Sequence, residues 1–275
     1  MKTLRNIGNL ILTVLIICSA TACSDENENE VVNPNIGNQS EKLIKSIIEE
    51  AGGKYQMSYK GKKLSNFKYY DYEGDLDTNI SFSYSENKAT MYDQDNKLYY
   101  EFNEKGYVTS IYDKNRYFEG TCSYDSDGYI TQLISEENED DYSYSSTIDF
   151  SYDNGNLIKS IEKNIEDGEE DITLHTYFYS EHENKSMLNF IGYDEFDYFL
   201  YSTSGFLGKA SKNLVSEIWV SEGGVLYEDK ILFYTWHTIY EYTYEFDSKG
   251  YVTKIHVKRS ANSSDEYTET YTLNY

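Results

Sequence analysis

Apolar and polar side chains alternate along much of this chain, and residues 241–257 show the pattern most clearly. Aromatic residues alternate with polar ones over residues 242–246, which is the two-residue period of a β-strand with one apolar face. Residues 247–250 read Asp-Ser-Lys-Gly, a turn signal, because aspartate accepts hydrogen bonds from the backbone that follows and glycine adopts positive φ. Residues 251–257 are rich in β-branched side chains, so the stretch predicts a β-hairpin.

This hairpin pattern recurs through the chain. Close copies surround Gly106, Gly128 and Gly155, and weaker ones follow Tyr59, Tyr84, Tyr179 and Tyr201. The repeat length, in the low to middle twenties of residues, corresponds to two strands with their turns. A single hairpin is unstable in water, so the copies must pair with one another. The copies therefore predict an all-β antiparallel meander of repeated hairpins, with roughly fourteen to eighteen strands.

The second strand of each hairpin departs from simple alternation. Val108 and Ile111 are three positions apart, as are Val252 and Ile255, so each pair lies on opposite faces unless a β-bulge intervenes. The predicted architecture is a large curved sheet, a barrel or a wrapped shell, and the pattern leaves these three forms open.

Two segments break the β pattern. Residues 40–51 predict a short N-terminal helix, with Asn38 as N-cap, apolar positions on one helical face and a Gly-Gly stop. Residues 194–208 are apolar and uneven, and predict a short helix or ordered loop near 195–201 that ends by Gly205 and plugs an open end of the sheet. Farther on, residues 221–224, Ser-Glu-Gly-Gly, predict a turn between two strands.

Composition adds to this prediction. The chain has 31 Tyr but 2 Trp, and a mean hydropathy of −0.69, so tyrosine rings must supply much of the buried apolar surface. Its formal net charge of −24 repels phosphate backbones, which argues against nucleic-acid binding.

The N-terminus predicts export. Residues 1–22 combine two positive charges with an apolar segment too short to span a bilayer, which is the pattern of a secretory signal peptide. Small residues before Cys23 resemble a bacterial lipobox, which implies lipidation of Cys23. The alternative is an ordinary signal peptide cleaved after Ala22. Once residues 1–22 are removed and Cys23 is lipidated, Cys122 is the remaining thiol, so no intrachain disulfide is expected and a buried, inert side chain is predicted.

Residues 23–38 are polar and form a predicted lipidated acidic tether before the hairpin-repeat domain of residues 39–275. The acidic run at 24–30 resembles the surface-export signal of Bacteroidetes lipoproteins, although a solvated tether would have the same composition. We therefore expect an outer-membrane lipoprotein, displayed on the cell surface and attached to the membrane through its lipid anchor.

The repeat itself carries a resemblance. The motif Y/F-D-x-x-G-Y-V/I-T-x-I, seen at residues 124–133 and 246–255, resembles the YD repeats of Rhs and teneurin-type proteins. Over about residues 55–275, including GFLGKASKNL at 205–214, the chain more closely resembles an uncharacterised family of Bacteroidales surface lipoproteins. The YD likeness implies a sheet that wraps into a shell, and it transfers no functional residue.

Candidate chemistry is sparse. The four histidines form no zinc motif, and Asp125 to Gly128 begins like a calcium loop but lacks its remaining ligands. With 48 carboxylates, acidic pairs identify no hydrolase site, and no nucleophile or phosphate-binding motif is present. We predict no catalytic residue, no metal and no cofactor.

Aromatic side chains in the irregular region are the candidate ligand-binding residues: Tyr198, Tyr201, Trp219 and Trp236. Rings on a rigid sheet can stack on sugars or contact a peptide, although each ring could equally fill the core. The leading hypothesis is a non-enzymatic, surface-anchored binding module for a glycan or a protein. The alternatives are an envelope-associated scaffold and a hydrolase, and the pattern does not indicate an oligomeric state.

Overall fold

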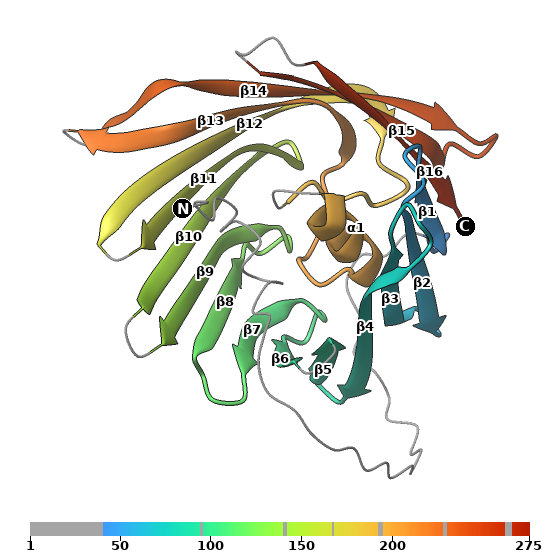
Figure 1. The fold of residues 1–275 in the computed structure, drawn as a ribbon, viewed down its shortest axis with the longest axis horizontal. Coiled ribbons are helices and arrows are strands. Elements are labelled where there is room, and N and C mark those ends of the chain that lie inside the picture. Colours follow the sequence, from blue (N-terminus) through green and yellow to red (C-terminus); the bar gives the residue numbers. More distant parts are fainter. Residues whose placement is uncertain are drawn as a thin grey trace.

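The computed structural model is a closed antiparallel β-barrel (Figure 1). It describes residues 41–93, 96–139, 142–166, 168–191, 195–227, 230–261 and 266–275. The strands are β1 Ser46–Glu49, β2 Lys54–Lys60, β3 Lys63–Tyr70, β4 Leu76–Ser85, β5 Lys88–Asp93, β6 Asn96–Phe102, β7 Val108–Asp113, β8 Phe118–Tyr124, β9 Ile130–Glu139, β10 Tyr142–Asp153, β11 Asn156–Glu166, β12 Glu169–Glu183, β13 Asn213–Tyr227, β14 Lys230–Phe246, β15 Val252–Ala261 and β16 Tyr267–Asn274. The signal peptide, the tether and Cys23 lie outside the described residues.

Closure of the barrel depends on β1. Every strand pairs with its neighbours in sequence, and β1 also pairs with β16, where Ile47 is opposite Leu273. The sheet is therefore a closed barrel rather than an open sheet or a wrapped shell. Its 16 strands agree with the number that the hairpin spacing predicts.

The predicted N-terminal helix at 40–51 is wrong, because residues 46–49 form β1. Ile47 is fully buried on the inner side, whereas Ile48 is 40% exposed on the outer side, as expected for a strand. The physical reason is long-range pairing: between β16 and β2 this short segment satisfies two sheet edges that a helix would leave open. Adjacent isoleucines suit either structure, so local sequence did not decide between them.

The inner face of the barrel is largely apolar and the outer face is polar. Tyr242 is buried inside β14, while Glu241 and Glu245 on the same strand point outward. The outward carboxylate of Glu245 pairs with Lys254 at 3.1 Å, and Lys88 pairs with Glu101 at 2.6 Å across β5 and β6. Opposite charges therefore pair across neighbouring strands on the outer face.

β-Bulges explain the unusual spacing in the second strands. In the β6–β7 pair the register shifts between Glu101 and Phe102, so one extra residue lies opposite them. Val108 and Ile111, three residues apart, both point inward and are buried. The same shift occurs in the β8–β9 and β14–β15 pairs.

The Asp-Gly turns between these strands have a local explanation. In the β14–β15 turn the Asp247 carboxylate accepts hydrogen bonds from the backbone N–H groups of Lys249 (2.8 Å) and Tyr251 (3.0 Å), and Gly250 has φ of +84°. In the β8–β9 turn, Asp125 accepts hydrogen bonds from the backbone N–H groups of Gly128 (2.8 Å) and Tyr129 (2.9 Å). Turn geometry therefore accounts for these aspartates, and calcium is not needed to explain them.

The described residues between β12 and β13, 184–191 and 195–212, enter the barrel, and we call this segment the plug. It contains α1, Glu195–Ser204, so the predicted helix near 195–201 is confirmed, and Figure 1 shows α1 inside the ring of strands. The Phe199 ring packs edge-on against Tyr55 and Tyr271 with centroid distances of 5.1 and 5.2 Å. No helix among the described residues is both long and apolar enough to cross a membrane.

The plug is hydrogen-bonded along the end of the barrel that carries the Asp-Gly turns. The backbone N–H groups of Lys209 and Lys212 donate to the carbonyl oxygens of Gly128 and Gly155, each at 2.9 Å. Gly208 makes this approach possible, because a Cβ at this position would lie 2.6 Å from the Gly128 oxygen. These bonds fix the plug to one end of the barrel.

Inward tyrosines tie neighbouring strands together at this end. Each hydroxyl in a recurring set donates to a backbone carbonyl at the start of the preceding strand or just before it: Tyr59 to Ile44, Tyr84 to Leu64, Tyr124 to Val108, Tyr179 to Leu157, Tyr244 to Val215 and Tyr275 to Val252, at 2.7 to 2.9 Å. The tyrosine of the repeat thus satisfies a carbonyl beside the bulge while its ring packs in the core. Tyr152 occupies a similar position on β10, but its buried hydroxyl has no partner.

The predicted turn at residues 221–224 is also wrong, because β13 continues through them. Gly223 has φ of +70°, and the register with β14 shifts between Glu222 and Gly224. The glycine pair forms a bulge within a long strand, a use of glycine that resembles a turn signal in sequence.

The tyrosine bonds generate a paired prediction. Tyr124→Phe removes the donor to Val108 and should lower the free energy of unfolding by about 1 kcal/mol. Tyr152→Phe removes a buried hydroxyl without a partner, so it should leave stability unchanged or raise it. Denaturant unfolding of both variants tests the pair, and equal losses would contradict this role for the hydroxyls.

Candidate functional site

A polar wall inside the barrel is the candidate site with the most perturbed chemistry. Its inward side chains come from three neighbouring strands: Tyr144 and Ser146 on β10, Ser160, Glu162 and Asn164 on β11, and Thr173, His175 and Tyr177 on β12. Ser160, Glu162 and Thr173 are at most 4% exposed. We call these eight residues the inner polar wall.

Glu162 lies at the centre of the inner polar wall. Its Oε1 atom accepts a hydrogen bond from the Ser146 hydroxyl at 3.2 Å, and the Asn164 side chain also bonds the carboxylate. The Tyr144 hydroxyl donates in turn to Asn164 Oδ1 at 2.8 Å. The second carboxylate oxygen, Oε2, is buried and has no hydrogen-bond partner. A buried carboxylate oxygen without a donor is costly, so this atom is the unusual feature of the wall.

The rest of the inner polar wall is internally paired. The hydroxyls of Ser160 and Tyr177 lie 3.2 Å apart and share a hydrogen bond. The ring of His175 stacks on that of Tyr177, with a centroid distance of 6.3 Å and an interplanar angle of 28°. This part of the wall therefore offers an aromatic face more than free polar atoms.

Burial shifts the titration of both acidic and basic groups. Burial raises the pKa of Glu162 from its ordinary value of 4.5 to about 7, partly offset by the bonds from Asn164 and Ser146. Burial lowers the pKa of His175 from 6.5 to about 4. A carboxyl group poised near neutral pH inside a barrel indicates a candidate binding or proton-exchange site.

The sequence did not reveal this site because β11 has reversed polarity. Ile161 and Ile165 point outward, and Ile165 is 36% exposed, while Ser160 and Glu162 point inward. Alternation alone assigns the isoleucines to the core and the glutamate to water. The side of the sheet to which each β11 side chain points follows from the pairing of β11 with β10. That pairing is the information that could have identified Glu162 as an inward residue.

The predicted ligand-binding aromatics have different positions. Tyr198 and Tyr201 belong to α1, and Trp236 belongs to β14 opposite Glu222, but their side chains lie outside the described part of the structure. Trp219 on β13 is described, points outward and is 46% exposed.

Trp219 has an aromatic neighbour that the sequence analysis did not select. Phe178 on β12 is 40% exposed, and its ring centroid lies 5.1 Å from that of Trp219 at an interplanar angle of 52°. The indole Nε1 donates to Glu217 Oε2 at 2.9 Å, which holds the ring in place. These two exposed rings form an apolar outer patch on β12–β13.

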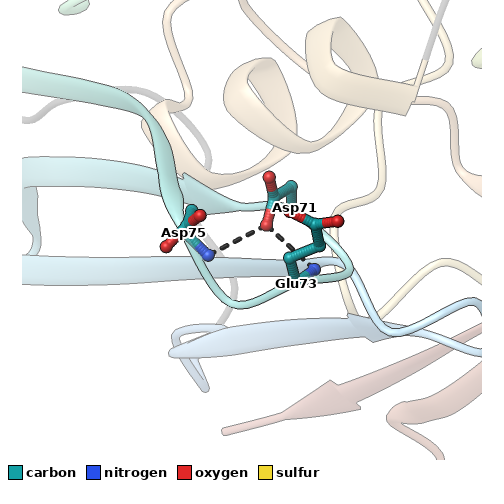
Figure 2. A group of neighbouring side chains, drawn as sticks. All are labelled: Asp71, Glu73 and Asp75. Carbon is teal, nitrogen blue, oxygen red and sulfur yellow. Dashed lines mark hydrogen bonds between the residues drawn. The ribbon is translucent and has the colours of Figure 1, made fainter.

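Two further groups have simpler explanations. Figure 2 shows the side chains of Asp71, Glu73 and Asp75 in the β3–β4 turn. One oxygen from each lies within 4.8 Å of the others. Asp71 Oδ1 already accepts the backbone N–H groups of Glu73 (3.0 Å) and Asp75 (2.9 Å), so turn formation explains the cluster. Cys122 is buried as predicted, and burial raises the pKa of its thiol to about 12, which makes it a poor nucleophile.

These features define the protein first as a plugged, closed antiparallel barrel with a polar inner wall. Residues 48–254 match the family described as a domain of unknown function (DUF4595) with porin-like fold, and the chain belongs to this family. The match fits the expected Bacteroidales family, whereas kinship with YD repeats stays a prediction.

Solved structures show the same fold. A porin-like protein from Bacteroides uniformis ATCC 8492 is 17% identical, with a TM-score of 0.60 over 88% of this chain and 99% of that one. A porin-like protein from Bacteroides vulgatus ATCC 8482 is 13% identical, with a TM-score of 0.56 over 85% of this chain and 99% of that one. No curated protein matches the chain.

The pKa of Glu162 predicts a pH-dependent stability. Because the folded state holds this proton more tightly than the unfolded state, its contribution is present below pH 4.5 and is lost as pH rises to about 7. The loss is up to about 3 kcal/mol. Glu162→Gln removes it, so the variant should gain stability relative to the native protein between pH 4.5 and 8.

Denaturant unfolding across this range measures the difference. His175 acts in the opposite direction, losing stability as pH falls from 6.5 towards 4, but it is common to both proteins and cancels in their difference. Asp149→Asn changes an outward carboxylate on β10 that bonds Gln132, and serves as the control. A pH-independent difference between Glu162→Gln and the native protein would contradict the buried, protonated carboxyl group.

Proposed function

We propose that this chain is a surface-anchored lipoprotein that acts as a non-enzymatic binding module for a glycan or a protein ligand. The observation that carries the proposal is the exposed Phe178–Trp219 pair on the outer face of the barrel. Among the described residues, ten large hydrophobic side chains are exposed, and two of them, Phe178 and Trp219, pack against each other on neighbouring strands. A clustered apolar patch with an oriented indole is typical of a contact surface rather than of a random exposed residue.

The geometry of the pair supports ligand contact. Both rings stand on neighbouring strands of a closed barrel, so their positions are set by the sheet and little order is lost on binding. The Glu217 carboxylate beside the indole can accept hydroxyl or amide donors from a ligand. A flat ring beside a carboxylate suits sugar stacking, and the same surface suits an apolar side chain of a protein.

The outer face also bears on how the protein meets the membrane. A transmembrane barrel presents an apolar band about 25 Å tall to lipid. Here the ion pairs Lys88–Glu101 and Lys254–Glu245 occupy outward positions on opposite parts of the barrel wall. We therefore propose that the barrel stands in water and that lipid on Cys23 supplies the membrane attachment, with the acidic segment at 24–30 directing surface display.

The ligand proposal is tested on a glycan array and by pull-down from envelope extracts. Trp219→Ala should weaken binding at least tenfold, about 1.4 kcal/mol, because the indole and its contact with Phe178 are lost together. Tyr72→Ala, at the exposed β3–β4 turn, is the control and should bind normally. If Trp219→Ala retains full binding to every ligand found, this face is not the binding surface.

The anchor has its own test. Cys23→Ala removes the predicted lipid acceptor, so the protein should move from the membrane fraction to the aqueous fraction. Protease treatment of intact cells expressing the native chain then reports surface display. Unchanged fractionation of the Cys23→Ala protein would refute lipidation.

A further inference from the structure

The inner polar wall contains a feature that the outer binding surface does not use. Glu162 is 2% exposed, and its Oε2 atom is buried without a hydrogen-bond donor. The neighbouring polar groups have partners of their own: Ser146 bonds the other carboxylate oxygen, the Asn164 side chain interacts with the carboxylate and with Tyr144, and Ser160 bonds Tyr177. The wall therefore lacks one donor, at one defined atom.

The reversed polarity of β11 shows that this wall is not ordinary core. Across β10–β12 the inward positions hold hydroxyl, amide and carboxyl groups, whereas the outward positions of β11 include Ile161 and Ile165. Phe199 of the plug contacts Tyr55 on β2 and Tyr271 on β16, whereas the plug reaches β11 and β12 near the Gly155 turn, where Ser211 bonds Leu157 and Tyr179. Polar side chains on the one wall and apolar ones beside Phe199 indicate that the two walls serve different contacts.

The charges around the wall favour a cation. The groups that shift the pKa of Glu162 are burial, two neutral side chains and the negative Asp171, and none is a lysine or arginine. The formal net charge of −24 attracts cations towards the whole protein. A neutral polyol would need several unpaired partners, and here Oε2 is the atom left open.

We propose that the inner polar wall is a binding site for a small molecule that carries a protonated amine, with its ammonium group donating to Glu162 Oε2. The stacked rings of His175 and Tyr177 provide an aromatic face for the apolar part of the ligand. β11 ends at Glu166, at the end of the barrel opposite the Gly155 turn. That end lies about 13 Å from Glu162, at 3.3 Å per residue.

Among the titratable groups around the inner polar wall, Glu162 determines how amine affinity depends on pH. Burial lowers the pKa of His175 to about 4 and raises that of Tyr177 to about 12, so both stay neutral between pH 6 and 8. Asp171 adds a nearby negative charge, and Tyr144 donates its hydroxyl to Asn164. Since the ammonium group binds the ionised carboxylate, affinity should rise about tenfold from pH 6 to pH 8, following the ionised fraction of Glu162.

The test uses the purified full chain and a pair of matched probes, 2-phenylethylamine and 2-phenylethanol, in isothermal titration calorimetry. They share their shape and differ in ammonium against hydroxyl, and an alkyl ammonium stays charged throughout this range. We expect the amine to bind, the alcohol to bind at least tenfold more weakly, and Glu162→Gln to lose at least tenfold in amine affinity. Asp149→Asn, which removes an outward carboxylate from the adjacent strand, should bind as the native chain does.

Three results would overturn the proposal: equal binding of alcohol and amine, undiminished amine binding by Glu162→Gln, or no amine binding at millimolar concentration. If Glu162→Gln does not fold, the native chain alone provides the test. Amine binding is then measured by calorimetry in two buffers of different ionisation enthalpy, which reports how many protons are released on binding. Amine binding at pH 6.5 should release a proton from Glu162, and binding without release would overturn the proposal. Trp219→Ala should leave amine binding intact, which separates this site from the outer patch.

Discussion

The width of the barrel is the constraint on which the rest of the structure depends. A closed sheet of 16 strands encloses more space than the side chains of its own strands can fill, whereas about eight strands are filled by side chains alone. This chain inserts the plug into that space, and Phe206 packs there against Phe82, Tyr100 and Phe102. Filling from within gives the inner face its apolar character and leaves the outer face free to be polar.

The inner and outer faces thereby reverse the polarity of a membrane-spanning barrel. The porin-like description of the family refers to the arrangement of strands, which this chain shares. Its outward side chains form ion pairs, and its inward side chains form the core. The exceptions to this rule carry the functional hypotheses, namely the exposed Trp219 patch outside and the buried Glu162 wall inside.

Local chemistry made much of the fold predictable, and long-range pairing limited the rest. The hairpins could be placed because aspartate and glycine specify each turn within four residues, as at 247–250. Barrel closure could not be predicted, because Ile47 pairs with Leu273 across almost the whole chain. The same distant contact turned a helix-like stretch into β1.

The candidate sites also divide into residues that local sequence could identify and residues that only strand pairing reveals. Trp219 could be selected from its type and region, but its partner Phe178 becomes visible through the register of β12 with β13. Glu162 could not be selected, because the outward Ile161 and Ile165 make β11 look as if its other face were buried. When both faces of a strand carry apolar and polar side chains, the sequence of that strand alone does not show which face points into the barrel.

The central claim, a closed barrel with a plug in its interior and an outer face in water, is tested most directly by sedimentation velocity. The Cys23→Ala chain without its signal peptide is measured in detergent-free buffer and again with detergent micelles. The account predicts one compact species that sediments identically in both and binds no detergent. Aggregation without detergent, together with a detergent-bound particle in its presence, would contradict it and indicate a lipid-facing barrel wall.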